Sequence, residues 1–187
     1  MKTRKVILAM QIPLDGYVEG PDGDLSWLNV VDEELWSELF HDLESVDIHL
    51  LGRKMYPGYA DHWRSMLSKP STNEGKYALL ADRTQHIVFT KSDFKPDWKN
   101  TKVAKDPSAE IARLKKENGK DIMVWGGANF AANLINLGLI DEYRITLNPA
   151  LIGDGKSFTD GLKKTSKLKF LSAKTLKSGL IILKYQS

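Results

Sequence analysis

Cysteine is absent from this chain of 187 residues. Disulfide bonds, thiol catalysis and cysteine-based zinc sites are therefore excluded. Long apolar runs are absent too, because no stretch approaches the roughly 20 residues that a membrane-spanning helix needs. The basic N-terminus leads into a short strand-like run that meets Pro13 and Asp15, and not into a signal-peptide core. We therefore expect a cytoplasmic protein that does not contact a membrane.

Neither sign of charge dominates the chain, because it has 27 lysines and arginines and 24 acidic residues, for a net charge of +3. This excess is too small to indicate nucleic-acid binding by itself. No run of arginines is interleaved with aromatic residues either. A nucleic-acid binder, which would bind DNA or RNA in a salt-sensitive way, is the least supported class. The four histidines are scattered without the spacing of metal ligands, so no metal site is expected.

The composition is that of an ordinary globular protein, with 42% apolar and 27% charged residues. The length suffices for one domain with a real core, and no linker or repeat divides it, so we expect a single domain over residues 1–187. Apolar periodicity and turn residues predict strands at 5–11, 47–51, 86–90, 101–104, 121–125, 141–148, 168–175 and 180–185. The same signals predict helices at 32–45, 74–81, 106–119 and 128–137.

Two segments show no regular pattern. Residues 16–27 are expected to form a loop over the end of the first strand, and residues 56–70, rich in Pro, Gly and Trp, are expected to be irregular. Elsewhere strands alternate with helices, and a turn at residues 177–179 closes a terminal hairpin. The order indicates an α/β fold with a mostly parallel central sheet, helices on both faces and an antiparallel C-terminal hairpin.

The most informative segment covers residues 122–130. An apolar run ends there in Gly126 and Gly127, and a helical pattern begins at once. A helix N-terminus carries free N–H groups and a partial positive charge, and glycine lets a phosphate approach the backbone. The segment therefore predicts a phosphate-bearing cofactor over Gly126, Gly127, Ala128, Asn129 and Phe130. The simpler alternative is a plain turn between a strand and a helix.

Two further strands end in polar or cationic groups, namely Gly52-Arg53-Lys54 and Thr90-Lys91-Ser92. In open α/β sheets, ligands bind outside the carboxyl ends of the strands. Three such ends would together form one crevice for an anionic ligand. The standard dinucleotide fingerprint, Gly-x-Gly-x-x-Gly, is absent, and so is the Walker phosphate loop.

In this order, the segments resemble the dihydrofolate reductase-like fold. They resemble more closely the stand-alone relatives of the reductase domain of the bifunctional riboflavin-pathway deaminase–reductase. The likeness runs from Val6 to about Tyr185. It is carried by Leu-Asp-Gly-Tyr at 14–17, Leu-Gly-Arg-Lys at 51–54, Trp-Gly-Gly-Ala at 125–128 and Asn-Pro-Ala-Leu-Ile-Gly-Asp-Gly at 148–155.

The resemblance implies a single dihydrofolate reductase-like domain that binds NADPH in an extended pose across the strand ends. By this resemblance Gly126 and Gly127 match the glycine pair under the cofactor phosphates, which a cis peptide often joins. Residues 52–54 match the contacts to the phosphates, and residues 90–92 match the segment that holds the adenosine 2′-phosphate. A cation paired with a hydroxyl suits a phosphate better than a bare ribose, so NADPH is preferred to NADH.

The chain also departs from the family pattern. Dihydrofolate reductases usually have a threonine two residues after the arginine, where this chain has Met55. The riboflavin-pathway reductases tend to have a serine before Leu-Asp-Gly, where residues 10–13 read Met-Gln-Ile-Pro. No zinc-ligand pattern marks a deaminase half. We therefore expect a protein other than the housekeeping riboflavin enzyme.

Family comparison places a substrate-holding carboxylate near the start of the helix after the first strand. Asp32 lies three and four residues before Leu35 and Trp36, so it can share their inward face, and Glu33 similarly shares a face with Trp36. Asp15 lies in a loop expected to cover the cofactor. Each has a simpler alternative, because acids in a first helical turn serve the helix dipole and Asp-Gly is a common turn.

Two aromatic residues complete the expected site. Trp27 could stack on a heterocycle or serve as a buried packing residue, and Tyr56 could close the pocket from above. The leading interpretation is an NADPH-dependent reductase that transfers a hydride to a small pterin- or pyrimidine-like heterocycle of the 5-amino-6-ribosylaminouracil class. The alternative is a non-catalytic nucleotide-binding module with a reductase fold. The resemblance also makes a homodimer plausible, with Leu139, Ile140 or the C-terminal strands at the interface.

Overall fold

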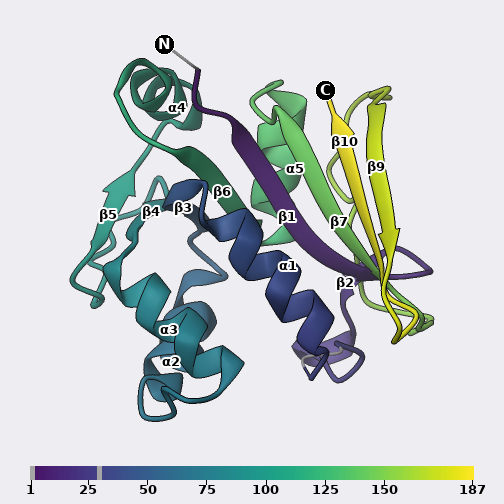
Figure 1. The fold of residues 1–187 in the computed structure, drawn as a ribbon. Helices are drawn as coiled ribbons and strands as arrows, with labels where there is room; N and C mark the ends of the chain where they lie inside the picture. Colours follow the sequence, from purple (N-terminus) through teal and green to yellow (C-terminus); the bar gives the residue numbers. More distant parts are fainter. Residues whose placement is uncertain (1–2, 29–30) are drawn as a thin grey trace.

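The computed structural model of the protein describes residues 3–28 and 31–187 (Figure 1). Eight of the described strands form one sheet in the order β5-β4-β3-β6-β1-β7-β10-β9. Their bounds are β1 (Val6–Pro13), β3 (Val46–Gly52), β4 (Gln85–Phe89), β5 (Thr101–Ala104), β6 (Asp121–Gly126), β7 (Glu142–Asn148), β9 (Lys169–Thr175) and β10 (Ile181–Gln186). A second, two-stranded sheet pairs β2 (Tyr17–Glu19) with β8 (Lys156–Ser157).

The inner strands of the large sheet run parallel. β1 pairs in parallel with β6 and β7, β3 does so with β4 and β6, and β4 does so with β5. Only β10 reverses the direction, pairing antiparallel with both β7 and β9 among the described strands. The predicted mostly parallel sheet with an antiparallel C-terminal hairpin is thus confirmed.

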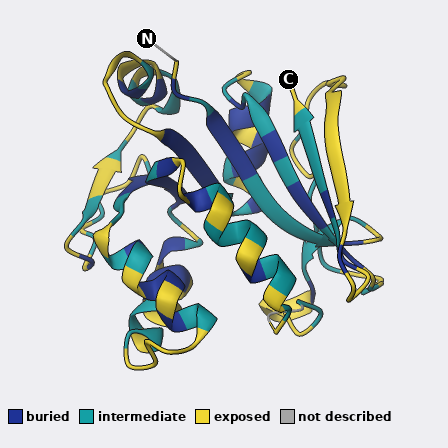
Figure 2. Ribbon diagram, viewed as in Figure 1, coloured by how far each residue is buried: buried dark blue, intermediate teal, exposed yellow. Residues whose placement is uncertain are grey.

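Helices cover both faces of the sheet, as predicted. α1 (Glu33–Leu43), α2 (Tyr56–Met66) and α3 (Asn73–Arg83) pack on the face that carries Ile7, Leu51 and Met123. α4 (Pro107–Lys116) and α5 (Ala128–Asn136) pack on the face that carries Val6 and Leu8. Because helices cover both faces, a parallel strand in the centre of the sheet is buried on both sides (Figure 2). This explains the continuous apolar run at the start of β1. No helix in the described part of the chain is long and apolar enough to span a bilayer.

The prediction of an irregular segment at 56–70 was wrong, because α2 occupies Tyr56–Met66. Tyr56, Tyr59 and Ala60 recur at helical spacing and are all buried, and this periodicity outweighs the Pro and Gly content. Pro57 stands in the first turn, where a missing N–H removes no helical hydrogen bond. The expected loop at 16–27 likewise contains β2 and a short 3₁₀ helix at Pro21–Gly23.

A neutral histidine pair lies inside the face covered by α2 and α3. His49 and His86 have no exposed surface, and their rings meet edge to face at a centroid distance of 5.2 Å. The Tyr59 hydroxyl lies 3.4 Å from Nδ1 of His49, 3.3 Å from Nε2 of His86 and 2.7 Å from the hydroxyl of Tyr77. Burial lowers the pKa of His86 to about 4 and holds the pKa of His49 well below its usual value.

This histidine pair predicts a loss of stability in mild acid. Below the ordinary histidine pKa of 6.5, these two histidines bind protons in the unfolded chain but stay neutral in the folded protein. The free energy of unfolding therefore falls as pH falls toward about 4. We expect His86 alone to contribute a loss of about 2 kcal/mol between roughly pH 7 and pH 5, above most carboxylate titration. Urea unfolding at a series of pH values measures this slope.

The matched controls are His86→Gln and His41→Gln. His86→Gln should flatten the pH dependence, whereas His41→Gln should leave it unchanged, because the side chain of His41 is 77% exposed. Equal slopes in all three proteins would contradict the assignment.

Candidate functional site

The carboxyl ends of the central strands open on one cleft of about 1380 Å³. One part of it is lined by residues that follow β3 and β6, and another by residues of α1, α2, α3 and β7. The first part contains two of the three predicted cofactor segments, and the second contains most of the aromatic side chains. Because both parts belong to a single cleft, two ligands could meet within it.

The β6–α5 turn forms one wall of the first part. Gly126 and Gly127 are joined by a cis peptide bond, as the resemblance implied. Gly126 has a φ of +108°, a conformation that side-chain-bearing residues rarely adopt. α5 then starts at Ala128, and no side chain caps its first turn. The free N–H groups of that turn face a cleft lined by Gly127, Ala128, Asn129 and Phe130, which makes an anion-binding end.

The β3–α2 connection forms the adjoining wall. Gly52, Arg53 and Lys54 line the same cleft, so the structure brings two of the three predicted strand ends together. Gly52 also has a packing role, because an added Cβ would lie 2.8 Å from Cβ of Phe130. Met55 occupies the position after Lys54, with its sulfur 3.7 Å from where a Cβ on Gly126 would lie. An apolar thioether therefore packs where a hydroxyl was expected by family comparison.

The third strand end, at residues 90–92, lies beside the second because β4 neighbours β3. Hydroxyls of Thr90 and Ser92 lie 2.9 Å apart, and Lys91 is exposed. The guanidinium of Arg53 sits 3.9 Å from the ring centroid of Phe94, which links the two strand ends. Residues 90–92 lie outside the described cleft lining, at the strand end next to it.

The three predicted carboxylates have structural partners instead of a place in the cleft. Asp32 is the N-cap of α1 and accepts a hydrogen bond from Leu35 N at 2.6 Å, and a hydrogen bond from Ser178 lowers its pKa. Glu33 accepts from Nδ2 of Asn73 at 2.8 Å, which joins α1 to α3. Neither Asp32 nor Glu33 is among the described residues that line the cleft. Asp32 thus caps the N-terminus of α1, and a substrate role for either acid stays a prediction.

Asp15 fastens a loop. One of its carboxylate oxygens accepts from the backbone N–H groups of Ile152 and Gly153, at 2.7 and 2.9 Å. The bond ties the glycine-rich segment 149–155 to the end of β1. Asp15 too lies outside the cleft lining.

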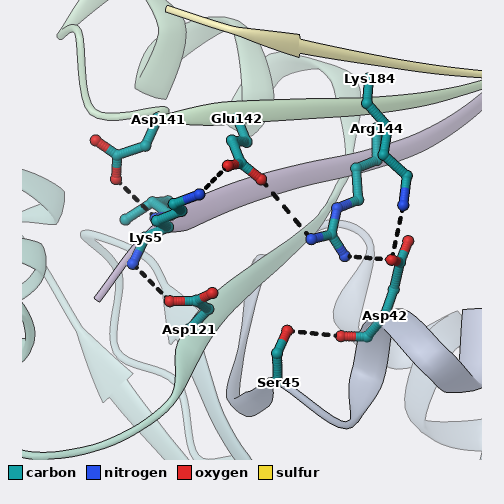
Figure 3. A network of polar contacts seen from close by, with 9 residues as sticks. Lys5, Asp42, Ser45, Asp121, Asp141, Glu142, Arg144 and Lys184 are labelled. Carbon is teal, nitrogen blue, oxygen red and sulfur yellow. Dashed lines mark hydrogen bonds and ion pairs between the residues drawn. The ribbon is translucent and has the colours of Figure 1, made fainter. Parts of the chain in front are cut away.

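Among the described residues, four acids line the cleft: Glu19, Glu38, Asp42 and Glu74. Glu38 and Asp42 lie one turn apart on α1. Sequence reasoning missed both, although they follow Leu35 at spacings of three and seven residues and so fall on the inward stripe. Glu38 accepts from Lys174 at 2.6 Å, and this bond lowers the pKa of its carboxyl group. Asp42 pairs with two cations, as Figure 3 shows: Nη1 of Arg144 at 3.0 Å and Nζ of Lys184 at 2.9 Å.

Aromatic side chains form the rest of the second part. Trp27 lines the cleft, as predicted for a substrate contact, although its role stays a prediction. The wall continues with Trp36, Trp63, Tyr77 and Trp125, and the rings of Trp63 and Tyr77 lie 4.2 Å apart.

Tyr56 is placed elsewhere. It is 2% exposed, and its hydroxyl donates to Asp97 at 3.0 Å and accepts from Trp98 N at 3.1 Å. It anchors the segment after β4 and does not line the cleft in the described structure. The described residues contain no group of three or more acidic or histidine side chains that could hold a metal ion.

Comparison with known proteins shows which family and which fold the chain is similar to. The family model of the RibD C-terminal domain matches residues 4–182. YyaP, an uncharacterized protein of Bacillus subtilis (strain 168), is 31% identical over 188 residues, covering 99% of this chain and 96% of that protein. A protein of Shewanella sp. PV-4 assigned to riboflavin biosynthesis has a TM-score of 0.73 at 19% identity, over 97% of this chain and 98% of its own.

Dihydrofolate reductase from Enterococcus faecalis has a TM-score of 0.63 at 14% identity, over 97% of this chain and 95% of its own. At such low identities the two structural likenesses show a shared fold. The dihydrofolate reductase-like fold expected from the sequence is thereby confirmed.

The position of Asp32 predicts a role in stability. Because its carboxylate caps α1, Asp32→Ala should lower the free energy of unfolding by about 1 kcal/mol while leaving the affinity for NADPH unchanged. Glu33→Ala is the matched neighbour and should change stability by less than about 0.5 kcal/mol. Urea unfolding and nucleotide titration of both variants measure the two effects. A large loss of turnover in Asp32→Ala at unchanged stability would instead restore its predicted substrate role.

Proposed function

We propose that this chain, which belongs to the RibD C-terminal domain family, is a reductase that uses NADPH to reduce a small nitrogen heterocycle of the pterin or pyrimidine type. The observation that carries the proposal is a single cleft that joins the open N-terminus of α5 to a wall of aromatic side chains. An anion-binding end suits a dinucleotide, and an aromatic wall suits a flat ring. Fold alone never fixes a reaction, so this joined cleft is the basis of the proposal.

The residues of the first part fit NADPH. The uncapped first turn of α5 offers N–H groups to the pyrophosphate, and Gly126 and Gly127 leave the approach free of side chains. Arg53 and Lys54 add positive charge on the adjoining wall. Lys91 and its neighbouring hydroxyls, just beyond, would hold the 2′-phosphate. The dihydrofolate reductase of Enterococcus faecalis, which shares this fold, binds NADP(H).

When bound, NADPH supplies a hydride to an electrophilic carbon of the substrate. The aromatic wall holds the ring, and the carboxylates of Glu38 and Asp42 orient its polar edge in the roles first expected of Asp32, Glu33 and Asp15. Glu38 acts as an acceptor and not as the acid, because Lys174 lowers the pKa of its carboxyl group and keeps it ionised at neutral pH. Water therefore delivers the proton that balances the hydride.

The second candidate is a nucleotide-binding module that does not turn over. Met55 favours it, because its thioether packs beside Gly126 where the related reductases usually have a hydroxyl. Both candidates bind NADPH, and only the reductase oxidises it. The cytoplasmic location, the homodimer and the single domain over residues 1–187 stay predictions of either.

Removal of the Lys91 side chain should weaken the binding of NADPH but not the binding of NADH. Loss of one charge-assisted contact to the 2′-phosphate costs about 1.5–3 kcal/mol, so Lys91→Ala should weaken NADPH roughly 10- to 100-fold. Binding of NADH, which lacks that phosphate, should not change. Titration followed by nicotinamide fluorescence measures both constants, with Lys116→Ala on α4 as the control for lost charge. An equal loss for both nucleotides would contradict the assignment.

Turnover tests the reductase itself. The full chain with NADPH should oxidise the nucleotide in the presence of at least one member of a panel of pterins, pyrimidines and flavin precursors. Glu38→Gln should bind NADPH normally and lose roughly 10- to 100-fold in kcat/KM, because the charged acceptor for the ring edge is gone. Lys116→Ala again serves as control. Binding of NADPH without turnover across the panel would favour the non-catalytic module.

A further inference from the structure

Glu74 differs from the other acids that line the cleft. Within the described part of the chain, those other acids all pair with a lysine or arginine: Glu19 with Lys156, Glu38 with Lys174, and Asp42 with Arg144 and Lys184. The ion-pair partner of Glu74 is His62, whose Nε2 lies 3.6 Å from Oε1 of the carboxylate, too far for a hydrogen bond. An imidazole is charged only when protonated, so Glu74 is the least neutralised acid of the cleft.

Glu74 lies where α2 and α3 pack against each other (Figure 1). It precedes Tyr77 by three residues on α3, so the two side chains share a helix face, and both line the cleft. The ring centroid of Trp63, on α2, lies 4.2 Å from that of Tyr77 and 4.6 Å from that of His62. The side chain of Glu74 is 33% exposed, so a ligand in the cleft can reach a carboxylate that stands beside aromatic rings.

A simpler role for Glu74 is to stabilise the first turn of α3, where an acid interacts with the partial positive charge of the helix end. The cap of that helix is already provided by the hydroxyl of Thr72, which accepts from Gly75 N at 3.0 Å. Glu34 holds the same position in α1, but it accepts from Lys177 N at 2.9 Å and does not line the cleft. The helix end alone therefore does not explain why Glu74 lines the cleft.

The surroundings of Glu74 suit a positively charged group. An ammonium group is attracted to a carboxylate and also to the faces of aromatic rings. A second carboxylate lies nearby, because Glu33 accepts from Nδ2 of Asn73, the residue directly before Glu74, at 2.8 Å. A negatively charged group in the same place would meet like charges without a lysine or arginine to offset them.

We propose that Glu74, His62, Trp63 and Tyr77 form a subsite that binds a protonated amino group carried by the substrate ring. The inference rests on the proposed function and names a substituent of that substrate. The ammonium group donates hydrogen bonds to the carboxylate of Glu74 and lies against the ring of Trp63. A phosphate or carboxylate substituent is excluded from this end of the cleft by repulsion.

Three pterins that differ only in the group at position 6 test the proposal. 6-Aminomethylpterin carries an ammonium group at neutral pH, 6-hydroxymethylpterin carries an uncharged hydroxyl, and pterin-6-carboxylate carries a negative charge. Calorimetric titration of the full chain with each pterin, with and without saturating NADPH, measures the three dissociation constants. We expect the aminomethyl compound to bind at least about fivefold more tightly than the hydroxymethyl compound, and the carboxylate to bind most weakly.

Variants connect this order to Glu74. Glu74→Gln keeps the shape of the side chain and removes its charge, so it should bring the aminomethyl and hydroxymethyl compounds to within about twofold of each other. Glu74→Lys should reverse the order, so that pterin-6-carboxylate binds more tightly than 6-aminomethylpterin. Glu34→Gln removes a charge at the matching position of α1, outside the cleft, and should leave the order unchanged. Circular dichroism and urea unfolding confirm that each variant folds.

The outcomes separate this inference from the function it rests on. Absence of NADPH binding overturns the proposed reductase, while the order of the pterins in nucleotide-free protein still tests the subsite. NADPH binding with equal or weaker binding of the aminomethyl compound overturns the inference alone. The inference is likewise overturned by an aminomethyl preference that Glu74→Gln leaves intact, or by the failure of all three pterins to bind.

Discussion

Burial of the central parallel strands on both faces is the constraint on which the rest of the structure depends. Side chains of β1, β3 and β6 such as Ile7, Leu50 and Val124 have no exposed surface, because helices pack on either side. The cleft opens at the carboxyl ends of the strands and at the margin where α1 lies over β7. The cleft consists of these two regions, so its position follows from how the sheet is covered.

The two parts of the cleft are built from different materials. The first part, which we propose holds the cofactor, is made mostly of backbone: a glycine turn at positive φ, the free N–H groups of α5, and Gly52 where an added side chain would meet Phe130. The second part, which we propose holds the substrate, is made of side chains on α1, α3, β6 and β7. A backbone site needs glycine at a few local positions, whereas a side-chain site needs residues that only the folded chain brings together.

This difference explains what could be predicted from the sequence. Local sequence patterns of a few neighbouring residues predicted the mostly parallel sheet, the helices on both of its faces and the turn at Gly126. The roles of Asp32 and Asp15 depend on partners across a helix end or a distant loop, and a carboxylate looks the same in either role. Glu38 and Asp42 were within reach of helical periodicity, because they share the stripe of Leu35. Their partners were not, since Asp42 and Lys184 lie 142 positions apart.

The long-range ion pairs also set how the substrate part can change. Asp42 joins α1 to both β7 and β10 through Arg144 and Lys184, and Lys174 joins Glu38 to β9. Oppositely charged partners hold the side chains of Glu38, Asp42 and Arg144 in place where they line the cleft. None of these contacts involves the β6–α5 turn. Substitutions along α1 or β7 are therefore expected to alter the part of the cleft lined by α1 and β7 while the β6–α5 turn stays the same.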